Sequence, residues 1–276
     1  MIRSSSALLL LSSMVALAIP VAAQQDARAP KAAEEALQEE EPAANPGRPT
    51  VSTPATLTPV GYLQFETGYL GAWHSPEFSS QSSFNEVVKF SVTPRIELLA
   101  AAGLFAHSLV ENQISNGAGG VAFGVQGVAY QGEGARPTIA FSYFREVYAG
   151  SAPDLDLGSP KNAILLLASA DIKGFHYDTN YFLDEVISGS IHRAQFGQTL
   201  SVSHPLVKNF GISAEIWHFT QPFLRGHAVG NLWALNYNLR KNMVFDGGFN
   251  RGLTSTSTQW EVFVGFTYLL PHKFTR

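Results

Sequence analysis

The stretch GFHYDTNYFLDEV, residues 174–186, decides between a soluble fold and a membrane fold. Two sets of side chains alternate along it, Phe175, Tyr177, Thr179, Tyr181 and Leu183 in one and His176, Asp178, Asn180, Phe182 and Asp184 in the other. A period of two predicts a β-strand with one largely apolar face and one largely polar face. In a soluble sandwich the apolar face packs inside the protein, whereas in an outer-membrane barrel it contacts lipid. The rest of the sequence has to decide which face points inward.

The same alternation recurs from Gly61 to Leu270, in about twelve segments of roughly ten residues each. Examples are GYLQFETGYLGAW at 61–73 and QWEVFVGFTYLL at 259–270. A tilted membrane strand needs about ten residues, whereas strands of a soluble sandwich are usually about half as long. The segment lengths therefore favour a membrane barrel.

The connections between the expected strands alternate in length. Tight connections are expected at 93–95, 131–137, 173–174, 204–209 and 240–242, and longer ones at 74–83, 106–118, 145–162, 185–193, 221–227 and 251–257. Short turns on one rim and long loops on the other are typical of bacterial outer-membrane barrels, with the short turns in the periplasm. We therefore predict an all-β fold, an antiparallel transmembrane β-barrel of about twelve strands with short periplasmic turns and longer extracellular loops.

In such a barrel the apolar faces point outward. We expect Phe175, Tyr177, Tyr181 and Leu183 to contact lipid, and His176, Asp178, Asn180 and Asp184 to face the lumen. A set of amphipathic rings is expected at headgroup level near strand ends, namely Trp73, Tyr177, Trp233, Tyr237, Trp260 and Tyr268.

The beginning of the chain predicts export. Arg3, the apolar run from Ala7 to Ala18 and the small residues ending at Ala23 match a signal peptide cleaved after Ala23. The alternative, an uncleaved anchor, needs a longer apolar run. The chain has no Cys and only 14% charged residues, against about a quarter in soluble domains. Closure of a sheet would stabilise an exported chain without disulfides. The net charge of −4 gives no indication of a nucleic-acid partner.

Four parts of the chain are expected. They are a signal peptide (1–23), an Ala/Glu/Pro-rich periplasmic linker (24–60), the barrel (61–270) and a C-terminal tail (271–276). The acidic and then Pro-rich composition of the linker suggests a flexible or extended chain. A further hypothesis is that residues 24–60 fold back into the lumen as a plug.

A family resemblance adds to this interpretation. GRPTVSTPATLTPVGYLQFETGYL at 47–70, the Gly-rich strand near 119–130 and the closing WEVFVGFTYLL at 260–270 resemble a family of outer-membrane proteins labelled "MetA-pathway of phenol degradation", or simply "transporter". The resemblance covers the chain from about residue 47 to its end. It implies an outer-membrane barrel and movement of small hydrophobic or aromatic compounds, and it brings no catalytic residues.

The end of the chain resembles the signal that the barrel-assembly machinery reads. Gly265, Tyr268 and Leu270 match its glycine and its spaced apolar or aromatic positions. Phe263 stands where a polar residue is usual, and Phe274 is followed by two more residues. The resemblance implies outer-membrane lipids and the assembly machinery as partners.

The charged residues expected in the lumen are mostly acidic. They are Glu66, Lys89, Glu97, Asp171, Asp178, Arg193, Glu215, Asp246 and Glu261. If they line a water-filled passage, their field favours cations. Alternatively, they pair with arginines of neighbouring strands and fill a narrow barrel.

The sequence predicts neither a cofactor nor a metal site. His176 and Asp178 are two ligands where a metal needs three or four, so a structural role is favoured. Glycines at 117–124 precede no helix that could hold a nucleotide. His218 and Asn231 would suit an embedded hydrolase, but no catalytic motif accompanies them. We therefore expect a non-enzymatic outer-membrane channel for small solutes, with a closed structural or surface-binding barrel, acting chiefly through residues 145–162, as the alternative.

Overall fold

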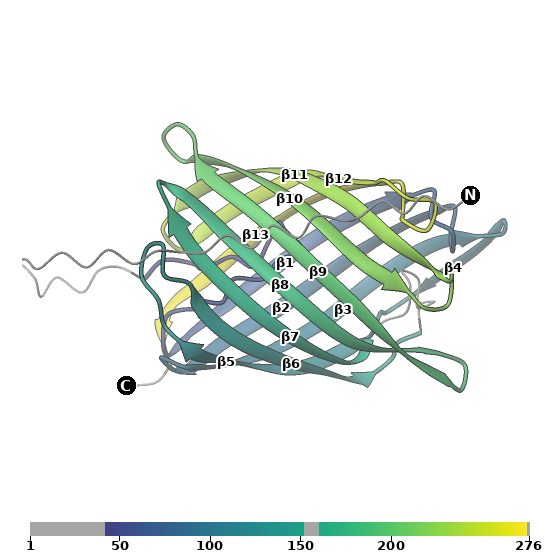
Figure 1. Ribbon diagram of the computed structural model, residues 1–276, viewed down its shortest axis with the longest axis horizontal. Helices are drawn as coiled ribbons and strands as arrows, with labels where there is room; N and C mark the ends of the chain where they lie inside the picture. The colour runs from purple at the N-terminus through teal and green to yellow at the C-terminus, as the bar shows by residue number, and fades with distance from the viewer. Residues whose placement is uncertain (1–41, 152–159, 275–276) are drawn as a thin grey trace, which may run out of the picture. The chain divides into compact units, whose positions relative to one another are not determined.

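The computed structural model describes residues 42–151 and 160–274. The described chain forms an antiparallel sheet that closes on itself (Figure 1). The expected signal peptide and residues 24–41 lie outside the described residues. Within the described part, no helix is long and apolar enough to cross a membrane.

The barrel wall has twelve strands. They are β1 (Tyr62–Trp73), β2 (Ser80–Thr93), β3 (Ile96–Val110), β5 (Val121–Tyr130), β6 (Thr138–Tyr148), β7 (Pro160–Ile172), β8 (Phe175–Ser188), β9 (Ile191–Pro205), β10 (Phe210–Gln221), β11 (Gly226–Arg240), β12 (Met243–Gly252) and β13 (Trp260–Lys273). The short β4 (Gln113–Gly117) folds back along the end of β3 and forms a hairpin with it.

Each wall strand pairs with its neighbours along the chain, and β1 pairs with both β2 and β13. This last pairing closes the sheet, so the barrel has no free edge. The predicted antiparallel barrel of about twelve strands is confirmed. The last strand runs three residues beyond the expected end of the barrel, to Lys273.

Polar side chains are buried and apolar ones exposed along the wall. On β8, Asn180 and Asp184 are 0% and 5% exposed, whereas Tyr181 and Leu183 are 55% and 43% exposed. A strand with this pattern has its polar face inside, which is the reverse of a soluble protein. The alternation predicted for the stretch at 174–186 is confirmed.

The outward rings lie partly at the rims. Trp73 and Trp260 stand opposite each other at one end of β1 and β13, and the ring of Tyr237 lies 4.8 Å from that of Phe210 at the other rim. Trp233 instead lies in the middle of β11.

The predicted sorting of connections into short and long is only partly seen. Residues 189–190 alone join β8 to β9, and 222–225 join β10 to β11, whereas 131–137 form a longer connection on the opposite rim. The polar ends of the expected loops continue as paired strands, because pairing satisfies their backbone groups. The β8–β9 hairpin therefore projects beyond its neighbours (Figure 1).

The apolar belt gives a stability prediction. Val264 is 55% exposed in the middle of β13, and Val207 is 68% exposed in the connection 206–209. V264R should lower the unfolding free energy in lipid vesicles by about 2–4 kcal/mol, because a charge is costly at mid-bilayer depth. V207R, the matched control, should lower it by about 0–1 kcal/mol. Equal losses in the two denaturant titrations would contradict a lipid-facing belt.

Candidate functional site: the barrel interior

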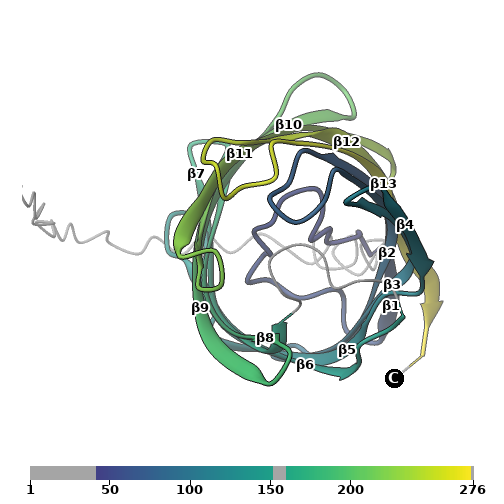
Figure 2. The same ribbon diagram turned by 90° about the vertical axis from the view of Figure 1, so that its right-hand side faces the viewer.

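Residues 42–60, the inner segment, lie inside the ring of wall strands, as Figure 2 shows. The segment forms neither helix nor strand, so its backbone amides need other partners. Its Ser52 and Ala55 are fully buried. Ala44 N–H donates to the carbonyl of Lys241 at 2.8 Å, in the turn between β11 and β12. The inner segment therefore begins at the rim that carries this short turn.

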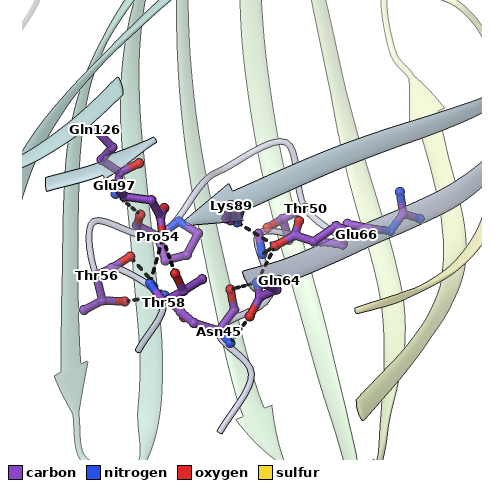
Figure 3. Close-up of polar contacts among 12 residues, drawn as sticks. Asn45, Thr50, Pro54, Thr56, Thr58, Gln64, Glu66, Lys89, Glu97 and Gln126 are labelled. Atoms are coloured by element: carbon purple, nitrogen blue, oxygen red, sulfur yellow. Dashed lines mark hydrogen bonds and ion pairs between the residues drawn. The ribbon is translucent and has the colours of Figure 1, made fainter. Parts of the chain in front are cut away.

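Asn45 and Gly47 join the inner segment to β1. Asn45 N–H donates to Gln64 Oε1, and Gln64 Nε2 donates back to the Asn45 carbonyl, both at 2.8 Å. Gly47 N–H donates to Glu66 Oε1 at 2.9 Å. Lys89 Nζ, from β2, lies 2.6 Å from the same oxygen (Figure 3). A buried ion pair is stable when further hydrogen bonds satisfy its groups, and the inner segment supplies one here.

Arg48 is the second anchor, and its side chain reaches β12. Its Nε and Nη2 donate to the two oxygens of Asp246 at 3.2 and 3.1 Å, in a bidentate pair. The guanidinium lies over Gly68 and Gly265, which face each other across β1 and β13. A Cβ at Gly68 would overlap the guanidinium, and one at Gly265 would lie 2.6 Å from Nε. Two small residues thus form the space that Arg48 occupies.

Glu215 on β10 holds the middle of the inner segment. It accepts the N–H groups of Val51 and Ser52, both at 2.7 Å, and the Ser52 hydroxyl at 2.6 Å. Ser52 Oγ also lies 2.8 Å from Thr199 Oγ1 on β9. Glu215 is only 4% exposed, and a buried carboxylate needs such donors because it has lost its water.

Two uncharged wall residues continue the path. Asn180 on β8 accepts from Thr53 N–H and donates to its carbonyl, both at 3.1 Å. Ser169 on β7 accepts from Ala55 N–H at 2.7 Å. Ala55 also packs in an apolar cluster with wall residues of β5, β6 and β7.

The end of the inner segment meets the remaining side of the wall. Gln126 on β5 donates to the Pro54 carbonyl at 3.0 Å. Glu97 on β3 accepts from Thr58 N–H at 2.9 Å and from its hydroxyl at 2.5 Å (Figure 3). Ser91 on β2 donates to the same oxygen at 3.0 Å.

The order of these contacts describes the path of the inner segment. After the bond of Ala44 to the β11–β12 turn, the segment bonds to β1, then to β12, β10, β9 and β8, then through Pro54 and Ala55 to β5 and β7, and last to β3 and β2. Apart from the exchange of β5 and β7 at the adjacent Pro54 and Ala55, this is the order of the strands around the wall. The inner segment therefore makes a circuit along the wall.

Several charged residues predicted to line the lumen hold this circuit. Glu66, Lys89, Glu97, Glu215 and Asp246 contact the inner segment or pair with a residue that does. Glu66, Glu97 and Glu215 accept backbone N–H groups of the inner segment. Asp246 pairs with Arg48 of the inner segment, and Lys89 pairs with Glu66 on the neighbouring strand.

His176 joins two other predicted residues near the short-turn rim. Its Nδ1 lies 2.8 Å from Asp171, whose side chain is 68% exposed, and its Nε2 lies 3.2 Å from the buried Asp178. Asp178 also accepts from Ser169 at 2.5 Å. Among the described residues, no group of three or more His, Cys, Asp or Glu side chains is arranged to hold a metal ion.

The last two predicted residues lie toward the outer rim. Glu261 accepts from Asn250 Nδ2 at 2.6 Å. Arg193 is exposed, donates to the Pro222 carbonyl, and lies 4.9 Å above the Phe223 ring.

The two residues considered for hydrolase chemistry lie on the adjacent strands β10 and β11, two positions out of register. His218 Nε2 lies 2.9 Å from His227 Nδ1 on β11. Asn231 stands opposite Ile216 on β10, further from the rim.

Apart from Asn180, which was predicted to face the lumen, the uncharged partners of the inner segment were not singled out from the sequence. They are Gln64, Gln126, Ser169, Asn180 and Thr199. All are polar and occupy inward positions of their strands, so the period of two could have found them. Arg48 was missed because it falls in the expected linker.

A cavity of about 690 Å³ occupies the outer half of the lumen. This outer cavity extends from Val51 of the inner segment to Ser257 and Thr258, in the β12–β13 connection. Its volume lies in the range of small-molecule sites, roughly 300–1,000 Å³. Its lining includes the rings of Phe144, Phe182, Trp217 and Phe219 and the carboxyl groups of Glu146, Asp184 and Glu261.

Comparisons with solved structures agree with this architecture. An outer membrane channel from Pseudomonas putida F1 matches with a TM-score of 0.60, over 82% of this chain and 100% of that one, at 13% identity. The chain has the fold of outer-membrane channels. The NanC porin matches with a TM-score of 0.52 over 75% of this chain and 98% of that one, at 11% identity. The KdgM porin gives 0.50 over 74% and 98%, at 14% identity. No family model and no curated protein matches the sequence.

The Glu215 anchor can be tested by hydrogen exchange. E215A removes the acceptor of two backbone N–H groups, so exchange at Val51 and Ser52 should become roughly ten- to a hundredfold faster. Hydrogen–deuterium exchange of the refolded protein in micelles measures this. D171A removes an exposed carboxylate outside the circuit and should leave both amides unchanged. Unchanged exchange in E215A would contradict the anchor.

Proposed function

We propose that this protein is an outer-membrane channel for small solutes and that its inner segment forms the constriction. The observation that carries the proposal is the circuit of the inner segment along the wall, with the outer cavity leading to it from the rim. A chain crossing the axis would block the lumen, whereas one that follows the wall narrows it. In a barrel of twelve strands, the wall alone leaves room for more than side chains.

The fold and the apolar outer surface of the barrel support a location in the outer membrane. Apolar side chains cover the outside of the strands, and the matching solved structures are outer-membrane channels and porins. One of them, the KdgM porin, is also solved in complex with oligogalacturonate. The resemblance to the MetA-pathway family favours hydrophobic or aromatic solutes for this chain. The short turns, and with them the start of the inner segment, would then lie in the periplasm.

The charges of the interior favour cations. Glu97, Glu215 and Asp184 have no basic partner within the described part of the chain, whereas Lys89 and Arg48 are each paired with one carboxylate. The resulting field would attract cations and repel free carboxylates.

Single-channel recording of the refolded mature protein in a planar bilayer tests both the constriction by the inner segment and the preference for cations. Under a salt gradient, we expect steady channels whose reversal potential shows a preference for cations. Deletion of residues 42–58 should raise the conductance, and the milder double variant R48A/E215A should raise it less. Heat-modifiable mobility on gels verifies that each variant has folded.

Two results would contradict the proposal. Folded wild-type protein that gives no current would mean a closed barrel, which is the surface-binding alternative. Unchanged conductance after the deletion would mean that the inner segment is not the constriction.

A further inference from the structure

Asp184 is buried in the wall of the outer cavity, and no basic group of the described residues pairs with it. It is 5% exposed, and its Oδ1 has no hydrogen-bond partner among residues 42–151 and 160–274. Its neighbours across the strands are Ala163 and Gln195. Gln195 Nε2 instead donates to the Thr220 carbonyl at 2.8 Å. A buried carboxylate without donors costs free energy, so a ligand that brings a donor would be stabilised there.

The Lys and Arg side chains on the strands next to β8 contact groups other than Asp184. Lys161 Nζ, on β7, lies 2.8 Å from Glu146 Oε2. Arg193, on β9, donates to the Pro222 carbonyl and lies over the Phe223 ring. The other oxygen of Glu146 is also buried without a partner in the described chain. This side of the outer cavity is therefore acidic.

Aromatic rings lie beside the acidic groups. The ring of Phe219 is 5.2 Å from that of Phe182 and 6.2 Å from that of Trp217. Phe219 lies over Gly197 and Trp217 lies over Gly230, where an added Cβ would overlap the ring. These glycines let the two rings lie against the wall, so the rings cover it with an apolar surface and leave the cavity open.

The spacing of charge and ring selects a class of ligand. Phe182 and Asp184 point inward two residues apart on β8, about 7 Å between Cα atoms. We propose that the outer cavity binds amphipathic organic cations, in which a protonated amine is joined by a short chain to an aromatic body. The amine would donate to Asp184, and the body would pack on Phe182 and Phe219, where an aromatic face also attracts cations. This inference deepens the proposed function, on which it rests, by naming the solute class.

Isothermal titration calorimetry of the refolded full chain in micelles tests the site without requiring conduction. The probe is 2-phenylethylammonium, titrated also into protein-free micelles. Phenylacetate keeps the ring and reverses the charge, and ethylammonium keeps the charge without the ring. We expect 2-phenylethylammonium to bind at least tenfold more tightly than either comparator.

Two variants locate the binding. D184N should weaken 2-phenylethylammonium at least tenfold, and F182L should weaken it while leaving ethylammonium unchanged. D171N, which alters an exposed carboxylate at the opposite end of the wall, is the matched control and should bind like the wild type.

The outcomes separate this inference from the proposed function. Absence of 2-phenylethylammonium binding, equal binding of phenylacetate, or full affinity in D184N would overturn the inference even if the barrel conducts. Selective binding by a folded barrel that carries no current would overturn the channel and keep the site.

Discussion

A chain without helix or strand can lie inside a barrel only when other groups satisfy its backbone amides. In this protein the wall provides them. Glu66, Glu97 and Glu215 accept N–H groups of the inner segment, and Ser169 and Asn180 do the same with uncharged oxygens. The path of residues 42–60, the width of the lumen and the extent of the outer cavity all depend on these bonds.

The same alternation that builds the wall provides both of its surfaces. One set of side chains covers the outside with apolar groups, and the other, which points inside, includes the polar acceptors. Small inward residues then determine where large inward side chains fit. Gly68 and Gly265 make room for Arg48, and Gly197 makes room for the ring of Phe219. The acceptors hold the inner segment, and the small residues leave space beyond it.

The wall could be predicted from the sequence because it depends on local periodicity. A period of two needs only neighbouring residues, and it placed Asp178 and Asn180 inside and Tyr181 outside, as the structure has them. The lengths of the connections were harder to predict from the sequence, because strand pairing continues into residues expected to be loops. Trp217 and Phe182 interrupt the polar inner faces at positions opposite Gly230 and Gly197, and periodicity along one strand does not reveal which residues stand opposite on the next.

The inner segment could not be traced in this way, because its bonds join distant parts of the chain. Arg48 meets Asp246 at a separation of 198 positions, and Val51 meets Glu215 at 164. Its composition suggested a linker or a plug folded back into the lumen, but not the path that it follows along the wall. The acidic inward residues were visible, but not that they would accept from backbone amides instead of lining open water.

The most direct test of the circuit is a disulfide between the inner segment and the wall. The chain has no native cysteine, and Ser52 Oγ lies 2.8 Å from Thr199 Oγ1, so S52C/T199C introduces a single candidate pair. Oxidation of this folded variant should yield a cross-linked species of altered gel mobility, whereas S52C/S108C, with its second cysteine on β3, should not. Failure of S52C/T199C to cross-link in a folded barrel would contradict the placement of the inner segment.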